Sequence, residues 1–336
     1  MILRRHLFLM ALQRGRFDAA IEMVRAARKS GQVRSAALYI RHGKTTIAES
    51  PAGIYLLASI TKPMTAAAVM LLADRGHLKL DDPVIKFIPE FKGADRAPMT
   101  IRHLLTHSSG LPDMLPENEA LRKRHAPLRD WVALTCKTPL LFAPGTQVRY
   151  QSMGILLASE IVERITKTPL LDMLRKEIFT PLGMRTASLG LGGRSIASTE
   201  QCEVTGNDDW NWNSPYWRDL GAPWGGVHAA ASDVAKFLEA FLNKDTDILK
   251  SATKTAMISN QTGGLNEPRG LGFMVKPGSF GSKCSPAAFG HYGSTGTVAW
   301  ADPKTDLVCV LLTTKPADSS RANLLGPVSD LVSEAV

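Results

Sequence analysis

Stretches with strand character lie near both ends of the chain, and little strand character lies between them. Two runs, Val33 to Ile40 and Thr45 to Ala48, flank a turn at His42 and Gly43. Three more occur after residue 270 and are separated by Gly and Asp-Pro turns: Gly272 to Val275, Thr297 to Ala301 and Leu307 to Leu312. The pattern predicts that the two ends of the chain meet in one antiparallel sheet.

The rest of the chain has apolar residues at helical spacing. These patterns are Phe17 to Lys29, Met64 to Leu72, Ile101 to Leu105, Leu128 to Thr135, Met153 to Thr166, Leu170 to Phe179, Ala231 to Leu242 and Ser319 to Val336. The sequence therefore predicts an α+β protein, with an antiparallel sheet flanked by helices and a mostly helical domain. We expect residues 1–80 and 200–336 to form the α/β domain, and residues 81–199 to form the helical domain.

Size and composition exclude some classes of protein. A chain of 336 residues with 44% hydrophobic content can bury one large core or two moderate ones. The net charge of +9 would suit an anionic partner, but the Lys and Arg residues are scattered, so no nucleic-acid partner is expected. The four cysteines form no C-x-x-C pair, which argues against a zinc ribbon and a dense disulfide framework. We expect them to be core residues in a reducing compartment.

The first residues have only part of the pattern of a secretory signal. Arg4 and Arg5 precede a short apolar run from Leu7 to Leu12, but polar and basic residues follow it instead of a cleavage site. We therefore expect an intact N-terminus and a cytoplasmic protein. The longest apolar stretch, Ala66 to Ala73, is too short for a bilayer, so no membrane span is expected.

A Ser-x-x-Lys motif precedes the apolar pattern at Met64 to Leu72. Residues three apart share one face of a helical turn, so the Lys62 amine can approach the Ser59 oxygen. A partly desolvated lysine with a lowered pKa can supply the base that a serine nucleophile needs. However, Ser251 and Lys254 form the same motif among polar residues on an expected surface helix. On this motif alone, an N-cap serine and a solvated lysine are the better interpretation.

The surroundings of Ser59 carry further motifs. They are Ala58-Ser59-Ile60-Thr61-Lys62-Pro63-Met64-Thr65, Leu80-Asp81-Asp82-Pro83 and Thr100-Ile101-Arg102-His103-Leu104-Leu105-Thr106-His107-Ser108-Ser109-Gly110-Leu111. With them the chain resembles the class C β-lactamase-related serine hydrolases of the β-lactamase and penicillin-binding-protein superfamily, closest in motif to family VIII carboxylesterases. The resemblance runs from about Phe17 to the C-terminus. It implies a β-lactamase/transpeptidase-like fold, an active site between the two domains, Ser59 as the nucleophile, and no metal or organic cofactor.

The resemblance also implies a second motif at Tyr150-Gln151-Ser152, which fits the form Y-x-S. Tyr150 would share proton transfer with Lys62 and protonate the leaving group. Ser152 would replace an asparagine that contacts substrate amides in relatives. The alternative for Tyr150 is a core tyrosine.

The third motif of the family is matched by His291-Tyr292-Gly293, followed by Ser294. By resemblance, the backbone N–H groups of Ser59 and Ser294 would form the oxyanion hole, while Gly293 lets a strand edge approach the substrate. His291 would line the site, and its alternative is a hydrogen-bonded loop histidine. A neutral imidazole holds an anion less well than the lysine of β-lactamases, so strong β-lactamase activity is not expected.

Two other groups of residues allow a functional interpretation. His103 and His107 are four apart, but no H-E-x-x-H motif and no third ligand accompany them, so no metal site is expected. Trp210 and Trp212 lie in an aromatic-rich loop that, in relatives, runs beside the active site. We expect either that they shape an apolar acyl or alcohol pocket or that they fill the domain interface.

These features predict acyl transfer from a small-molecule carboxylic ester to Ser59, followed by hydrolysis. The same residues would serve a D-alanyl peptidase, a weak β-lactamase or an acyltransferase. A non-catalytic scaffold with the same fold is the alternative from another class. The chain has neither G-x-S-x-G nor a nucleotide-binding glycine motif, so α/β-hydrolase and nucleotide chemistry are not indicated.

Overall fold

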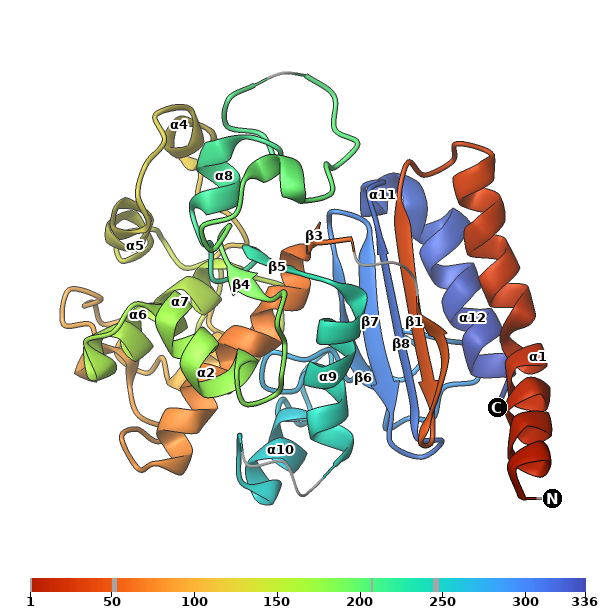
Figure 1. The fold of residues 1–336 in the computed structure, drawn as a ribbon. Coiled ribbons are helices and arrows are strands. Elements are labelled where there is room, and N and C mark those ends of the chain that lie inside the picture. Colours follow the sequence, from red (N-terminus) through yellow and green to blue (C-terminus); the bar gives the residue numbers. More distant parts are fainter. Residues whose placement is uncertain (1, 50–52, 207, 244–247) are drawn as a thin grey trace.

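A five-stranded antiparallel sheet joins the two ends of the chain (Figure 1). The computed structural model describes residues 2–49, 53–206, 208–243 and 248–336. The strand order is β2-β1-β8-β7-β6, with Ala36 opposite Thr313 and His42 opposite Leu307 in the β1–β8 pair. The strands are β1 (Ala36–His42), β2 (Thr45–Glu49), β6 (Phe289–Gly293), β7 (Thr297–Asp302) and β8 (Leu307–Thr313). The prediction that both ends share one sheet is confirmed.

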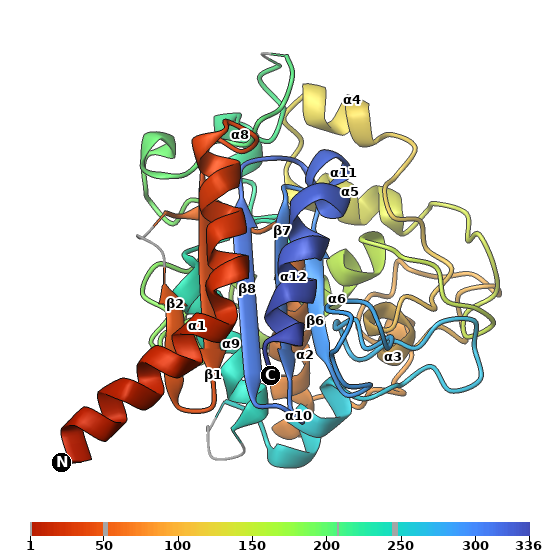
Figure 2. The same ribbon diagram turned by 90° about the vertical axis from the view of Figure 1, so that its right-hand side faces the viewer.

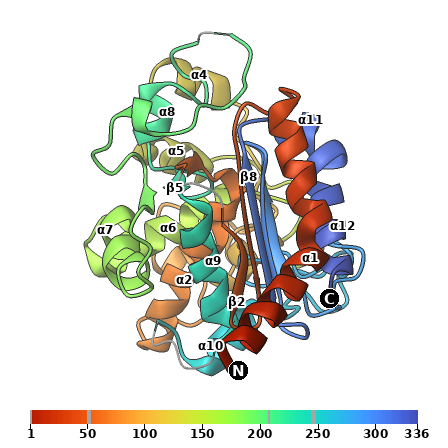
Figure 3. The same cartoon turned by 45° about the vertical axis from the view of Figure 1, so that its right-hand side comes forward.

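Helices cover both faces of this sheet (Figures 2 and 3). On one face α1 (Ile2–Lys29) lies beside α12 (Gly326–Glu334), and α9 (Ala231–Leu242) packs against the other face. Strands β7 and β8 are buried along their whole length, which explains their nearly continuous apolar sequence. Phe17 and Trp300 are among the side chains that fill the core around α1, α12 and the sheet.

The helical part of the molecule surrounds α2 (Thr61–Asp74), which is buried on nearly all sides. This burial accounts for its run of Ala, Met, Leu and Val without a polar face. Helix α2 packs against α6 (Met153–Thr166). The other helices are α3 (Ile101–Leu105), α4 (Asn118–Lys123), α5 (Leu128–Thr135), α7 (Leu170–Leu174), α8 (Pro215–Asp219), α10 (Ser251–Met257) and α11 (Ala317–Ser320).

Short elements connect these helices. A three-stranded sheet has the order β3-β5-β4, formed by β3 (Tyr55–Leu56), β5 (Val227–Ala229) and β4 (Ser188–Leu189). The 3-10 turns are η1 (Ala58–Ile60), η2 (Val84–Lys86) and η4 (Ile196–Ser198), and the π-helical segments are η3 (Arg175–Phe179) and η5 (Arg321–Leu325). The β3–β5 pair brings the chain before Ser59 against the segment that precedes α9.

Most predicted helices are confirmed. Helices α3, α5, α6 and α9 begin and end at the predicted residues. The pattern from Leu170 to Phe179 changes from α to π geometry at Arg175, and α1 begins at Ile2 instead of Phe17. In the described part of the chain, no helix has the length and apolar content needed to cross a membrane. Met1 lies outside the described residues.

The strand prediction for Gly272 to Val275 is wrong. Within it, only Met274 makes isolated bridges, with Arg269 and Gly290. Gly272 has φ +80°, which takes the backbone out of the extended conformation. The sheet ends beside this segment with β6. Two of the five residues in β6 are glycine, so its composition does not indicate a strand.

Candidate active site

Ser59 lies in a tightly held turn just before α2. The preceding residue, Ala58, has φ +49°, a left-handed conformation that is uncommon for residues with a side chain. The backbone N–H of Leu57 donates to the carbonyl of Val227, and the Thr297 hydroxyl donates to the carbonyl of Leu57 over 2.9 Å. These bonds fix the turn between β5 and β7. Such backbone conformations persist where the surrounding structure holds them, and they cluster at functional sites.

Lys62 is fully buried in the first turn of α2. Its Nζ donates to Ser59 Oγ over 3.0 Å and to the Trp224 carbonyl oxygen over 3.1 Å. Burial lowers the pKa of Lys62 to about 7, while Asp113 raises it and Arg269 lowers it. A lysine with this pKa is unprotonated in a large fraction of molecules at neutral pH, so it can accept the serine proton.

Tyr150 approaches Ser59 from the other side. Its hydroxyl donates to Ser59 Oγ over 2.7 Å, and Lys62 Nζ lies 4.7 Å from the centre of its ring. Burial raises the pKa of Tyr150, and the hydrogen bond to Ser59 opposes that rise. Tyr150 is therefore a protonated phenol at rest, able to give a proton to a leaving group. The structure brings together all three residues that the motifs predicted for proton transfer.

Gly293 ends β6 against the turn that holds Ser59. A Cβ atom at this position would lie 2.2 Å from Thr297 Oγ1 and 2.3 Å from the Leu57 carbonyl oxygen, so only glycine fits without displacing the backbone. Ser294 follows directly and lines the same cavity as Ser59. The end of β6 thus lies against the turn that holds Ser59.

The two remaining motif residues are already held by hydrogen bonds. His291 is buried on β6, and its Nδ1 lies 2.6 Å from the Tyr292 carbonyl oxygen. Burial lowers the pKa of His291 to about 3, so its imidazole is neutral. Ser152 donates to Asp113 Oδ1 over 2.6 Å. Both residues line the cavity with Ser59.

Ser59 and Tyr150 open on a cavity of about 490 Å³, and small-molecule sites typically span roughly 300–1,000 Å³. The apolar part of its lining includes Leu56, Met114, Trp212, Trp217, Trp224, Met274 and Tyr292. Its charged lining residues are Asp113, Arg122, Arg269 and Arg321. Sequence reasoning did not single out these four, because they come from separate segments and no spacing links them to the motifs.

The two tryptophans predicted to shape a pocket differ in their position relative to the cavity. Trp212 lines the cavity, whereas Trp210 is not among the lining residues. The Arg122 guanidinium carbon lies 3.8 Å from the centre of the Trp217 ring and 5.2 Å from that of Trp210. Arg122 also donates to the Trp210 carbonyl oxygen over 3.0 Å. Trp210 therefore packs behind the cavity wall, against Arg122.

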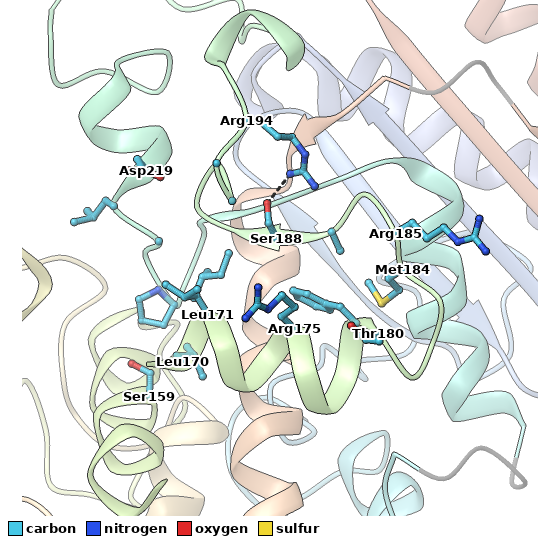
Figure 4. A pocket seen from close by; sticks show the side chains of 18 of the residues that line it. Ser159, Leu170, Leu171, Arg175, Thr180, Met184, Arg185, Ser188, Arg194 and Asp219 are labelled. Carbon is cyan, nitrogen blue, oxygen red and sulfur yellow. Dashed lines mark hydrogen bonds between the residues drawn. The ribbon is translucent and has the colours of Figure 1, made fainter. Parts of the chain in front are cut away.

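A larger cavity of about 860 Å³ is lined in part by Leu220, Gly221 and Pro223 (Figure 4). Figure 4 shows Leu170, Leu171 and Arg175 around it, and Arg194 donating to Ser188 over 2.6 Å. Neither Ser59 nor Tyr150 lines this cavity. The smaller cavity, which Ser59 and Tyr150 line, is therefore the candidate active site.

The histidines considered as metal ligands take part in local hydrogen bonds. Nδ1 of His103 accepts from the backbone N–H of Thr100, which caps α3. Nδ1 of His107 accepts from the backbone N–H of Gln151 over 3.3 Å. The His107 ring thus braces the segment beside Tyr150, and the His103 ring belongs to the cap of α3.

The second Ser-x-x-Lys motif is arranged differently from the first. Ser251 is exposed at the start of α10. Lys254 is buried, not solvated as the expected surface helix implied, and its Nζ donates to the Asn243 carbonyl oxygen over 3.0 Å. The motif belongs to the packing of this helix.

The chain is similar in sequence to an esterase and to a putative carboxypeptidase. The chain is 34% identical over 198 residues to the esterase EstB of Burkholderia gladioli, covering 51% of this chain and 50% of EstB. It is 28% identical to a putative D-alanyl-D-alanine carboxypeptidase of Escherichia coli K12, covering 78% of this chain and 69% of that protein. The match with EstB thus spans about half of that esterase.

The fold has close counterparts among solved structures. A family VIII carboxylesterase superposes with a TM-score of 0.79 at 20% identity, covering 95% of this chain and 96% of that structure. A model of the beta-lactamase family matches residues 20–330. That match covers most of the chain, including Ser59, Lys62 and Tyr150. The chain therefore belongs to the beta-lactamase family of serine hydrolases.

Proposed function

We propose that this protein hydrolyses carboxylic esters through an acyl-enzyme on Ser59. The observation that carries the proposal is the pair of hydrogen bonds that Ser59 Oγ receives, from Lys62 over 3.0 Å and from Tyr150 over 2.7 Å. This oxygen faces a cavity with mostly apolar walls, where an ester can lie. The esterase and carboxylesterase among the similar proteins support the same substrate class.

Acylation begins when Ser59 Oγ attacks the ester carbonyl carbon and its proton moves to the unprotonated Lys62. The negative charge that develops on the carbonyl oxygen is held by the backbone N–H groups of Ser59 and Ser294. The tetrahedral intermediate collapses as the carbon–oxygen bond breaks, and Tyr150 gives its proton to the leaving alkoxide while Lys62 reprotonates Tyr150. Water then attacks the carbonyl carbon of the acyl-enzyme and gives a proton to Lys62 and Tyr150. As the bond between this carbon and Ser59 Oγ breaks, the pair returns a proton to Ser59 Oγ, and the carboxylic acid leaves.

The neutral state of His291 removes the cation that β-lactamases carry at this position of the third motif. A β-lactam carries a carboxylate that the lysine of β-lactamases binds by its charge. Burial lowers the pKa of His291 to about 3, so this position offers no cation near neutral pH. Most esters carry no such anion and do not need one.

A D-alanyl peptidase is the second candidate. Arg321 lines the same cavity and lies 4.1 Å from the centre of the Tyr292 ring, beside the third motif. Its guanidinium can bind the C-terminal carboxylate of a peptide, which His291 cannot. The putative carboxypeptidase among the similar proteins points the same way.

The test compares p-nitrophenyl esters from acetate to octanoate, nitrocefin and a peptide ending in D-alanyl-D-alanine. Each is assayed with the wild type, Ser59→Ala and Ser251→Ala, the last being the matched control in the second Ser-x-x-Lys motif. Ester turnover that is lost only in Ser59→Ala supports the proposal. Release of D-alanine without ester turnover supports the peptidase. No turnover, with no labelling of Ser59 by a fluorophosphonate probe, would leave a non-catalytic scaffold.

A further inference from the structure

Arg269 is a buried cation next to Tyr150. Its guanidinium carbon lies 5.8 Å from the centre of the Tyr150 ring, and the residue is only 6% exposed. Nη2 pairs with Glu267 Oε1 over 2.7 Å. Within the described residues, its buried Nε and Nη1 have no hydrogen-bond partner. Because buried donors without partners destabilise a fold, stability alone does not account for this side chain.

The other basic side chains around the Tyr150 ring are either neutral at neutral pH or change their charge near it. Lys62 from α2 lies 4.7 Å from the ring centre, while the rings of His107, after α3, and His291, on β6, lie at 4.8 and 6.0 Å. Burial lowers the pKa of both histidines well below neutral pH. The pKa of Lys62 is about 7, so its charge changes around neutral pH. Among these groups, Arg269 alone keeps its positive charge throughout.

We propose that Arg269 is a positioning residue whose fixed charge beside the Tyr150 ring sets the pH range in which Lys62 and Tyr150 can take the proton of Ser59. A fixed cation disfavours a second positive charge on Lys62 and favours negative charge on the Tyr150 oxygen. Both effects make an unprotonated base available to Ser59 at a lower pH than in a site without this cation. The carboxylate of Asp113 acts on Lys62 in the opposite direction, and the carboxylate of Glu267 pairs with Arg269 and partly offsets its charge.

This inference rests on the proposed function, and its readout is the pH dependence of Ser59 chemistry. The first variant is Arg269→Gln, assayed by kcat/KM for an ester and by the rate at which a fluorophosphonate ester modifies Ser59. Loss of the cation raises the pKa of Lys62, so the acidic limb of both profiles moves to higher pH by about one unit. Arg269→Lys keeps the charge and returns the limb toward its wild-type position. A purely structural role would lower the rates at all pH values without moving the limb.

A second variant is expected to shift the acidic limb of the pH profile in the opposite direction. Glu267→Gln leaves the charge of Arg269 without its counter-charge, so the limb moves to lower pH. The Glu267 side chain is 30% exposed, so this change is mild. It keeps the inference testable if Arg269→Gln does not fold. Packing defects do not explain shifts of opposite sign from two members of one ion pair.

Failure of the role of Arg269 can be distinguished from failure of the proposed function by the activity of the wild type. If the wild type hydrolyses esters through Ser59 but the limb of the folded variants coincides with that of the wild type, the role of Arg269 is overturned and the proposed function stands. If the wild type neither turns over esters nor reacts with the probe at any pH, the proposed function fails and the inference fails with it. Opposite shifts in Arg269→Gln and Glu267→Gln support both.

Discussion

The buried amine of Lys62 lies 3.0 Å from the hydroxyl oxygen of Ser59. This short contact is possible because Ser59 sits in a turn that leads into α2, and Lys62 lies one turn further along. The same burial that places the amine also lowers the pKa of Lys62 to about 7. The geometry and the largest cause of the lowered pKa therefore have one origin, the packing of α2 into the core.

Replacement of Lys62 by Met removes the base and should lower kcat by about 10²- to 10⁴-fold. In the wild type, kcat/KM should rise through an acidic limb centred near pH 7, because Lys62 is protonated below its pKa of about 7 and cannot accept a proton there. The measurement is a pH profile for one p-nitrophenyl ester. A limb near the pKa of an ordinary carboxylic acid would contradict the assignment.

Lys62→Arg is the matched control for charge. An arginine stays protonated at every accessible pH, so this variant keeps a cation near Ser59 but has no base. We expect it to be as inactive as Lys62→Met. Substantial activity in Lys62→Arg would mean that the charge is what matters and that Tyr150 alone takes the proton.

Tyr150→Phe keeps the ring and removes the hydroxyl that donates to Ser59 over 2.7 Å. We expect kcat to fall by about 10²- to 10⁴-fold while KM changes little, since the hydroxyl acts on the reacting atoms. Tyr39→Phe, on β1 in the large sheet, is the control and should retain full activity. The idea fails if p-nitrophenyl and alkyl esters are both hydrolysed at wild-type rates by Tyr150→Phe.

The sequence predicted the parts of the site that short motifs encode. The spacing of Ser59 and Lys62 allows contact on one helical turn. Ser251 and Lys254 have the same spacing, so the further motifs around Ser59 were needed to choose between the two pairs. Tyr150 lies 91 positions after Ser59, and its hydrogen bond is a product of tertiary packing. Its assignment came from the resemblance to a family, because no local pattern links the two residues.

What the sequence did not indicate depends on side chains from distant segments. Arg122 enters the cavity from the short helix α4, and Asp113 and Arg269 enter it from two loops. A charged residue in such a segment looks like a solvated one until its neighbours are known. The sequence also did not indicate the strand β6, because of its glycines. Gly293 allows close approach to the Ser59 turn and Gly290 allows close approach to Trp300 on β7, but glycine has a low propensity for strands.

Gly293→Ala tests that close approach. The new Cβ would lie 2.2 Å from Thr297 Oγ1 and 2.3 Å from the Leu57 carbonyl oxygen, so the end of β6 must move away from Ser59. Misplacing the backbone N–H of Ser294 should lower kcat by about 10²- to 10³-fold, and overpacking should cost on the order of 1–3 kcal/mol of stability. Activity and thermal unfolding report the two effects.

Gly263→Ala is the control for a glycine replacement that meets no neighbour within 4 Å. It should leave both activity and the unfolding midpoint unchanged. Equal losses in the two variants would show that the effect of Gly293→Ala is not specific to the Ser59 turn.

Trp212 and Trp210 offer a matched pair for the shape of the cavity. Trp212 lines it, whereas Trp210 packs behind the wall against Arg122. Trp212→Ala enlarges the apolar space, so the preferred acyl length of p-nitrophenyl esters should shift to longer chains, with kcat/KM for the best short ester falling about 10-fold or more. Trp210→Ala should keep the wild-type preference, because its ring does not touch the substrate space. The assignment is wrong if both variants show the same chain-length profile as the wild type, or if Trp210→Ala alone changes it.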